Sequence, residues 1–332
     1  MTMKVVITGG AGFIGRQLAE RLLALGELPG RDGKPQAIDE LVLFDAVEPA
    51  PFKTPDKRLR AVTGDIADRA LVARTIDRNT GSVFHLAAVV SAAAEADFDL
   101  GMRVNVEGTL AVLEACRALP QPARLVFTSS IAVFGGDMPP TLVDTTPLTP
   151  QTSYGAQKAI GELLVNDYSR KGFIDGRALR LPTIVVRPGK PNKAASTFAS
   201  SILREPLAGQ DAICPVERSA RMWILSPRRA VESLLHAHAL PAERWGANRS
   251  LTLPGIEVGI GDMVDGLGRV AGKGPVGRIK WQPDAHIQKI VAGWPYRFDP
   301  ARAKGLGFAA DRSIDEIVQA HIDDQLGGKF AA

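Results

Sequence analysis

The glycine-rich segment that joins the first apolar run to the first amphipathic run most constrains what this chain can fold into. Residues 4–8 read KVVIT, a run too short for a helix, and they continue directly into GGAGFIG over 9–15. The next residues, 16–26, read RQLAERLLALG and carry apolar side chains at helical spacing. A short buried strand, a glycine turn and a helix in this order predict a βαβ unit and therefore a parallel sheet.

The same alternation continues over the first 190 residues. Near-continuous runs of Val, Ile, Leu and Phe indicate strands whose two faces are both buried, as parallel sheets require. We therefore predict an α/β fold built on a Rossmann-type doubly wound parallel sheet. The further strand candidates are 41–45, 58–65, 82–88, 124–130 and 178–186, and helical patterns lie at 13–25, 100–118 and 152–171.

The glycine turn has the features of a phosphate-binding turn. Gly9 is expected to permit the tight turn, Gly12 to let backbone N–H groups approach a pyrophosphate, and Gly15 to allow close helix–strand packing. The helix N-terminus adds positive potential, and we expect Phe13 and Ile14 to line the same site. An ordinary glycine turn is the alternative, but strand, spacing and helix together favour a dinucleotide.

Acidic residues follow the second and third strand candidates. Asp45 can accept hydrogen bonds from both ribose hydroxyls and would repel a 2′-phosphate, which favours NAD over NADP. Its distance from Gly15 exceeds the ~20 residues that are usual, because residues 27–39 add what we expect to be an exposed polar loop. Asp65, followed by Ile66, is expected to contact the adenine, with a plain strand-end turn as the alternative.

Beyond Pro188 the chain becomes richer in Pro and Gly and is broken into short elements. We expect residues 1–190 to form the NAD-binding Rossmann domain and 191–332 a smaller α+β lobe that mainly binds substrate, with the chain crossing between the two. Helical patterns in this part lie at 228–239, 260–272 and 313–323, and possible strands at 250–253 and 278–281.

Composition excludes several classes of protein. The net charge of +4 is compatible with an anionic partner, but basic residues do not cluster and aromatics make up only 6%, so nucleic-acid binding is not expected. Cys116 and Cys214 are too few for a zinc site or a disulfide framework, which predicts no metal and a reducing cytoplasm. Because glycines interrupt the first apolar run and no later run is long enough, we expect neither a signal peptide nor a membrane span.

Tyr154 and Lys158 lie four residues apart in a helical pattern, hence on one face and one turn apart. In isolation such a pair usually belongs to a surface. Here it follows a strand over 124–130 that ends in two hydroxyls, at the carboxyl edge where parallel sheets bind ligands. His85, at the end of another strand, is interpreted as structural.

Several segments together resemble the extended short-chain dehydrogenase/reductase family, also described as NAD-dependent epimerases and dehydratases. The resemblance covers nearly the whole chain and implies an NAD-dependent oxidoreductase. The segments that carry it are GGAGFIG (9–15), HLAA (85–88), NVEGT (105–109), SSIAVFG (129–135) and YGAQK (154–158).

The resemblance implies roles for the Tyr/Lys pair and the hydroxyls. Tyr154 would be the acid/base, Lys158 would lower the pKa of that tyrosine and hold the ribose, and Ser130 would hydrogen-bond the reacting oxygen. Ser130 is chosen over Ser129, which stays the alternative, because residues 133–135 look like the family's Val-Tyr-Gly. A phenol is a poor base at neutral pH, and a shift of ~3 pH units needs ~4 kcal/mol of phenolate stabilisation. Lys158 and oxidised nicotinamide, both cationic, can supply it.

Further positions follow from the same resemblance. Asn105 looks like the family asparagine that supports the active-site helix and a water relay. It is also implied to lie at the cofactor, together with Tyr154 and Lys158. The remaining implied NAD contacts are Leu86, Ala87, Ala88, Pro182 and Ile184.

The substrate pocket departs from the commonest pattern of the family. Members that act on nucleotide sugars carry an asparagine in a motif like R-x-x-N, where this chain has Thr183 after Arg180. A basic, polar loop over 187–192 follows, which suits a small anion. Thr183, Ser130 and Tyr154 are expected to touch the substrate, and Arg221 or Arg187 to pair with a carboxylate.

Within the family, residues 150–209 look closest to a dehydrogenase of small sugar acids. That resemblance implies NAD-linked oxidation of the C2 hydroxyl of a four-carbon sugar acid to the 2-oxo acid. A nucleotide-sugar 4-epimerase or dehydratase is the alternative, and a non-catalytic dinucleotide-binding protein is a remote one. Family analogy also predicts a homodimer through the helices at 100–118 and 152–171.

Overall fold

The computed structural model describes residues 2–189 and 196–331, and the chain divides into two compact units. The chain passes repeatedly from one unit to the other. The expected domain boundary between residues 190 and 191 lies outside the described residues. Unit 1 comprises Met1–Val133, Thr152–Arg180 and Val231–Leu251, and unit 2 comprises Phe134–Gln151, Leu181–Ala230 and Thr252–Ala332.

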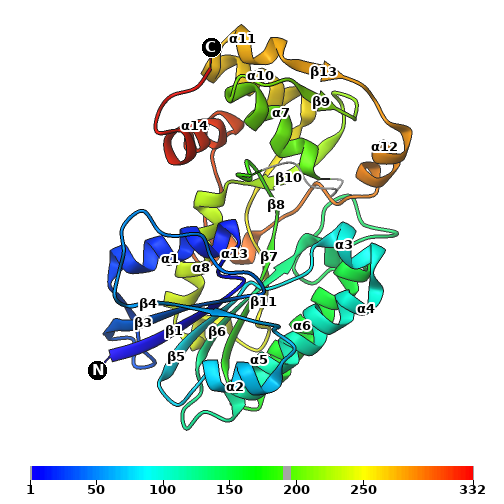
Figure 1. The fold of residues 1–332 in the computed structure, drawn as a ribbon. Helices are drawn as coiled ribbons and strands as arrows, with labels where there is room; N and C mark the ends of the chain where they lie inside the picture. Colours follow the sequence, from blue (N-terminus) through cyan, green and yellow to red (C-terminus); the bar gives the residue numbers. More distant parts are fainter. Residues whose placement is uncertain (1, 190–195, 332) are drawn as a thin grey trace. The chain divides into compact units, whose positions relative to one another are not determined.

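Unit 1 is built on a sheet that contains eight strands within the described residues, in the order β11-β7-β6-β5-β1-β3-β2, with β4 also paired to β3 (Figure 1). β1 pairs in parallel with β3 on one side and β5 on the other, so the strand order runs outward from β1 in both directions. This arrangement confirms the predicted doubly wound sheet. The strands are β1 (Thr2–Thr8), β2 (Glu27–Pro29), β3 (Pro35–Asp45), β4 (Leu59–Thr63), β5 (Thr80–His85), β6 (Arg124–Ser130), β7 (Asp175–Leu181) and β11 (Ser250–Thr252).

Helices cover both faces of this sheet. Figure 1 shows α2, α5 and α6 together on one side and α1 on the other. His238 of α8 stacks on Phe84 of β5, with ring centroids 5.4 Å apart. The helices are α1 (Phe13–Leu25), α2 (Arg69–Thr75), α3 (Ser91–Ala96), α4 (Phe98–Gly101), α5 (Gly108–Arg117), α6 (Ser153–Arg170), α8 (Pro227–Ala239) and α9 (Ala242–Trp245), with a π-helical segment η1 (Met102–Glu107) and a 3₁₀ turn η2 (Ile131–Val133).

Residues 27–39 are mostly exposed, as expected, but they do not form the expected loop. β2 pairs antiparallel with the first residues of β3, with Glu27 opposite Ala37, so this segment is a hairpin on the sheet edge. Gly33 has φ +76° at the turn, a conformation that favours glycine. Leu28 and Ile38 are both buried and stabilise the hairpin against the rest of the unit.

Residues 178–186, expected as one strand, form two. β7 ends at Leu181, and Pro182 follows, which has no N–H to continue a ladder. β8 (Thr183–Ile184) then pairs in parallel with β10 of unit 2, Thr183 opposite Ile224. The chain therefore changes both sheet and unit at this proline.

Unit 2 contains a three-stranded sheet in the order β12-β10-β8 and a parallel pair of β13 and β9. Apolar side chains from α7, β10, α10 and α14 form its core, among them Ile202, Ile224, Leu267 and Val318. The remaining elements are β9 (Ala212–Cys214), β10 (Arg221–Leu225), β12 (Ile256–Gly259), β13 (Ile279–Trp281), α7 (Thr197–Leu207), α10 (Ile260–Ala271), α11 (Lys273–Gly277), α12 (Ala285–Ala292), α13 (Ala301–Gly305) and α14 (Ile314–Leu326). Across both units, none of the helices in the described ranges has the length and apolarity needed to traverse a bilayer.

Candidate active site

The glycine turn between β1 and α1 packs tightly against the loop that follows β5. Gly9 has φ +72°, and a Cβ atom added there would lie 2.8 Å from Ala87 N and 2.9 Å from the carbonyl carbon of Leu86. A Cβ on Gly15 would collide with the carbonyl oxygen of Gly9. Gly12 precedes α1 with an extended backbone, and among the described residues no side chain caps this helix. Backbone N–H groups at the start of α1 are therefore open to an anion.

Asp45 reaches this turn despite the long insertion before it. Its Oδ2 accepts a hydrogen bond from Ala11 N at 2.9 Å, and the side chain is half-buried. Asp65 makes a strand-end turn, in which its Oδ1 accepts a hydrogen bond from Ala67 N at 3.0 Å, and it forms an ion pair with Arg103. Ile66 beside it is buried.

The loop after β5 is held by side chains from β1 and η1. Ala87 N donates to Thr8 Oγ1 at 3.2 Å, and the neighbouring Leu86 and Ala88 are half-buried. Asn105 of η1 binds the same loop at Val89, two residues after Ala87. Its Oδ1 accepts from Val89 N at 2.8 Å and its Nδ2 donates to Val89 O at 3.0 Å.

Asn105 also contacts the helix that carries the Tyr/Lys pair. Its Nδ2 donates to Oε1 of Gln157 at 2.7 Å, and both side chains are buried. The asparagine therefore joins the loop after β5 to α6. Sequence reasoning missed Gln157, for which adjacency to Lys158 was the available signal.

His85 is buried between β1 and α5. Its Nδ1 lies 2.6 Å from Thr8 Oγ1 and its Nε2 lies 2.9 Å from Thr109 Oγ1. Burial, with a smaller contribution from the Lys158 charge, lowers the pKa of His85 to about 3. The imidazole is therefore neutral and ties two elements together.

Tyr154 and Lys158 occupy the first turns of α6, which begins with Thr152 capping Gly155 N. Lys158 is buried and its Nζ donates to the carbonyl oxygen of Thr128 at 2.8 Å. The same Nζ lies 4.7 Å from the ring centre of Phe127 and 5.7 Å from that of Tyr154. Burial lowers the pKa of Lys158 to about 7, against an opposing effect of Glu162.

The two hydroxyls at the end of β6 have different partners. Ser129 is buried and donates to Oε1 of Glu162 at 2.6 Å. Ser130 is half-buried, and its Oγ accepts a hydrogen bond from Ala132 N at 3.1 Å, which leaves its own O–H to donate elsewhere. Sequence reasoning missed Glu162, although it follows Lys158 by four residues on the same helix face.

The residues expected to bind substrate in unit 2 lie on separate elements. Thr183 and Ile184 are half-buried in β8, after the buried Pro182. Arg187 N donates to Ser200 Oγ at 3.1 Å, and its Nη2 donates to Ser196 Oγ at 3.2 Å. Residues 190–192 of the expected anion-binding loop lie outside the described residues.

Arg221 is on β10, where its side chain is 43% exposed and its Nε lies 2.8 Å from Oε1 of Glu257. Arg297 pairs with the same carboxylate at 2.9 Å. These two arginines, Arg297 first, hold the pKa of Glu257 below its usual range. Two partly exposed arginines, Arg221 and Arg297, therefore share the carboxylate of Glu257 in unit 2.

Unit 1 thus brings together two sets of the expected residues. One set is the glycine turn with Asp45 and the loop over 86–88, and the other is the start of α6 with the end of β6 and Asn105. Arg187 and Arg221 belong to unit 2, where each has its own partners.

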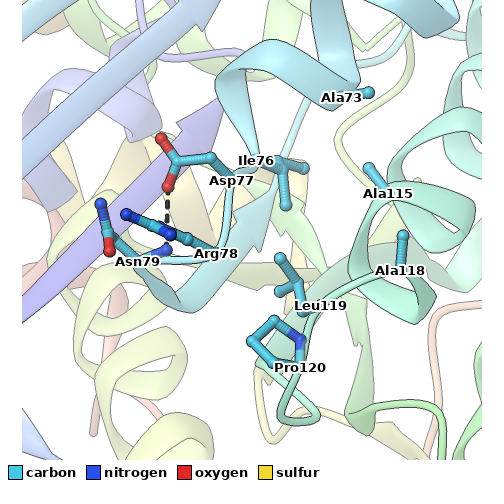
Figure 2. A pocket seen from close by; sticks show the side chains of 9 residues that line it. All are labelled: Ala73, Ile76, Asp77, Arg78, Asn79, Ala115, Ala118, Leu119 and Pro120. Carbon is cyan, nitrogen blue, oxygen red and sulfur yellow. Dashed lines mark hydrogen bonds between the residues drawn. The ribbon is translucent and has the colours of Figure 1, made fainter.

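A pocket of about 450 Å³ lies elsewhere in unit 1, between the ends of α2 and α5 (Figure 2). Asp77 and Asn79 on its rim precede β5, whereas the glycine turn packs on the loop that follows β5. Because β1 and β5 are parallel, the pocket and the glycine turn lie at opposite edges of the sheet. The pocket is therefore no part of the candidate active site.

Comparison with known proteins gives consistent results. Residues 5–229 match the model of the NAD dependent epimerase/dehydratase family. D-erythronate dehydrogenase of Cupriavidus necator is 54% identical over 97% of this chain and 98% of its own length. D-erythronate dehydrogenase of Haemophilus influenzae is 45% identical over 97% and 99%. The crystal structure of a nucleoside-diphosphate-sugar epimerase from Agrobacterium tumefaciens superposes with a TM-score of 0.93 at 42% identity, covering 99% of this chain and 96% of that one.

Proposed function

The chain belongs to the NAD-dependent epimerase/dehydratase family and is an NAD-dependent oxidoreductase, and on this premise we propose that it oxidises the C2 hydroxyl of D-erythronate to 2-oxo-tetronate. The observation that carries the chemistry is the buried Lys158 ammonium 5.7 Å from the Tyr154 ring. Two relatives with this name match over nearly the full chain, which supports the substrate.

The glycine turn fits a dinucleotide. A Cβ at Gly9 or Gly15 would collide with backbone atoms, so the tight turn requires glycine at both positions. Uncapped N–H groups at the start of α1 suit a pyrophosphate. Asp45 beside the turn suits ribose hydroxyls. We assign Gly12, Phe13, Ile14 and the loop over 86–88 to the same cofactor site, along with Asp65, Ile66, Pro182 and Ile184. When bound, NAD supplies the hydride acceptor.

Tyr154 is the proton acceptor in this proposal. Its phenolate takes the proton of the C2 hydroxyl while the C2 hydrogen leaves as hydride, so the carbon is oxidised and the tyrosine ends protonated. The Lys158 ammonium favours the phenolate electrostatically, and the low dielectric around a buried cation strengthens this effect. Asn105 holds α6 in place through Gln157.

Ser130 is the hydroxyl that donates to the reacting oxygen. The hydrogen bond from Ser129 to Glu162 supports this choice, because the Ser129 hydroxyl already donates inside the protein whereas the Ser130 hydroxyl remains able to donate to the substrate.

Thr183 and Arg187 are assigned to the substrate in unit 2. Arg221, the most exposed of these residues, pairs with the substrate carboxylate, since a guanidinium binds a carboxylate through two hydrogen bonds.

Deuterium at C2 of D-erythronate tests the site of oxidation. The proposal expects the NADH formed from this substrate to carry the label and its formation to be slower than with unlabelled substrate. Label that stays in the organic product, with no slowing, would mean that another carbon is oxidised.

A nucleotide-sugar epimerase is the second candidate, favoured by the name and the 42% identity of the Agrobacterium tumefaciens structure. Such an enzyme would oxidise and reduce one carbon with no net change in NAD. Incubation with UDP-sugars therefore discriminates between the two. Sugar interconversion without accumulation of NADH would favour the epimerase, and NADH formed from D-erythronate the dehydrogenase.

We also propose that the protein is a cytoplasmic homodimer that pairs through α5 and α6. Leu163 and Ile160 of α6 are 69% and 37% exposed, which leaves an apolar stripe on this helix. The buried free thiols of Cys116 and Cys214 support a reducing compartment. Light scattering on the wild type and on Leu163→Glu tests the dimer, because a charge on the stripe should give monomers.

A further inference from the structure

Three titratable side chains follow one another along one face of α6. Tyr154, Lys158 and Glu162 are spaced by four residues, so each lies one turn beyond the last. Lys158 and Glu162 are both 2% exposed. Two buried charges on one helix are costly unless paired, so their partners indicate what the arrangement does.

The carboxylate of Glu162 joins three elements. Arg180 of β7 donates to it through Nε at 2.9 Å and Nη2 at 2.7 Å, in a bidentate pair with both side chains buried. Ser129 of β6 donates to the same carboxylate at 2.6 Å. Helix α6 is therefore fixed to the ends of the two strands beside it.

Lys158 is surrounded by few charges. Tyr154 and Glu162 face it from α6, the neutral His85 from β5, and β6 supplies the Thr128 carbonyl and the Phe127 ring. Arg180 of β7 lies behind Glu162, to which it is bonded. Among these groups in the described residues, the carboxyl group is that of Glu162.

We propose that Glu162 is a positioning residue for the reaction, which keeps Lys158 cationic beside Tyr154 and orients the end of β6 through Ser129. The inference rests on the proposed roles of Tyr154 and Lys158. Burial alone lowers the pKa of Lys158, and the charge of Glu162 opposes that change. Without Glu162 the neutral amine is favoured, and the phenolate of Tyr154 loses its cation.

The hydrogen bond to Ser129 has a second consequence. Ser129 is buried and donates to Glu162, so the residue next to Ser130 is fixed against α6. The same carboxylate therefore acts on the Lys158 charge and holds the end of β6.

The ionisation of Tyr154 can be measured without substrate. The chain contains 3 tyrosines, so the ultraviolet absorbance of tyrosinate during a pH titration, minus that of the Tyr154→Phe variant, isolates this phenol. The measurement uses the whole protein and needs no knowledge of the substrate.

Glu162→Gln is expected to raise the midpoint of Tyr154 ionisation by about one pH unit. Loss of a negative charge acts directly on the phenol in the opposite direction. Glu162, however, is ~12 Å from Tyr154 along the helix and Lys158 only ~6 Å, so the loss of the lysine charge dominates. An unchanged or lower midpoint would contradict the proposal.

The same substitution in a Lys158→Met background is the matched control. With no lysine to act through, Glu162→Gln should leave the midpoint unchanged or lower it slightly. A rise as large as in the Lys158 protein would show that Glu162 acts by another route and would overturn the inference.

Glu162→Gln leaves Arg180 buried without its carboxylate and could fail to fold. The double variant Glu162→Gln/Arg180→Gln avoids this, because it removes both partners of the buried ion pair. The charge of Glu162 opposes the fall in the pKa of Lys158, so its loss should still raise the midpoint in the double variant. A midpoint equal to that of the wild type would contradict the proposal.

The outcomes separate this inference from the proposed function. If D-erythronate does not reduce NAD but Glu162→Gln raises the midpoint, the substrate is wrong and the inference holds. If D-erythronate is oxidised and the midpoint does not rise, only the inference fails. For an active enzyme, the acid limb of the kcat profile of Glu162→Gln should move to higher pH by the same amount as the titration.

Discussion

The two units each contain a carboxylate with two cations near it, but in opposite surroundings. In unit 1, Glu162 is paired with Arg180 and its charge acts on Lys158, and all three side chains are buried. In unit 2, Glu257 pairs with Arg221 and Arg297, whose side chains are 43% and 48% exposed. The same charges can therefore serve different purposes.

The degree of burial determines how much each ion pair contributes to stability. Breaking a buried ion pair costs about 3–5 kcal/mol because a charge is left without water or partner. An exposed pair is worth about 0–1 kcal/mol. The buried group of unit 1 is thus a fixed source of potential inside the protein, whereas Arg221 of unit 2 can exchange Glu257 for an anion from solution.

Removal of the Tyr154 hydroxyl, on which the buried Lys158 cation acts, should have the largest effect on activity. Tyr154→Phe is expected to reduce NADH formation from D-erythronate by about a thousandfold, since a positioned acid/base contributes ~10²–10⁴. The melting temperature should stay close to that of the wild type. Tyr168→Phe, on the same helix but bonded to Glu114, is the matched control and should keep full activity.

The next prediction compares the two pairs directly. Arg180→Met should lower the free energy of unfolding by about 3–5 kcal/mol, because it leaves the Glu162 carboxylate buried without its partner. Arg297→Met should lower it by less than ~1 kcal/mol. Urea unfolding of both variants measures the difference. Equal losses would show that burial does not distinguish the two groups.

Arg221 tests whether the exposed group serves a ligand. Arg221→Ala should raise KM for D-erythronate by about 10- to 100-fold, as expected for a charge-assisted hydrogen bond of ~1.5–3 kcal/mol, with a smaller change in kcat. Arg218→Ala is the control, since Arg218 is another exposed arginine of unit 2 and pairs with Asp265. A KM equally raised in both variants would point to a general charge effect.

The smallest predicted effect concerns acid stability. Burial lowers the pKa of His85 to about 3 and that of His321 to about 4, and lowers that of His238 well below its usual value. The unfolded chain binds protons below pH ~6.5 and the folded protein does not, so stability falls as pH decreases from ~6.5 toward ~4.

Each buried histidine should contribute up to ~1.4 kcal/mol per pH unit within this window. His321→Leu is expected to reduce the slope of unfolding free energy against pH, measured by urea unfolding between pH 7 and 5. His286→Gln, at an exposed position, should leave the slope unchanged. A steeper dependence of the unfolding free energy on pH in His321→Leu would contradict the lowered pKa of His321.

Local sequence patterns correctly predicted many of the strands and helices of unit 1. The run over 124–130 and the amphipathic segment over 13–25 match β6 and α1 residue for residue, and Gly12 and Gly26 mark the two ends of α1. The hairpin over 27–39 was missed, since its strands pair across a polar turn, with Leu28 opposite Gln36, and Leu28 and Ile38 are its buried apolar side chains. Alternation over so few residues gives little signal.

The candidate site divides in the same way. Tyr154 and Lys158 could be found because both lie on one helix at a fixed spacing. Glu162 lies on that helix too, but its bonds to Ser129 and Arg180 join residues far apart in sequence. The partners of Arg187 and Arg221 come from other elements, which spacing along the chain does not predict.

The most direct test of the account is NADH formation by the purified protein with NAD and a panel of D- and L-erythronate, threonate and UDP-sugars. The account predicts that D-erythronate reduces NAD, that NADP is a poor substitute, and that Tyr154→Phe slows the reaction about a thousandfold. Failure of every acid to reduce NAD, with a UDP-sugar interconverted and no NADH accumulated, would contradict it.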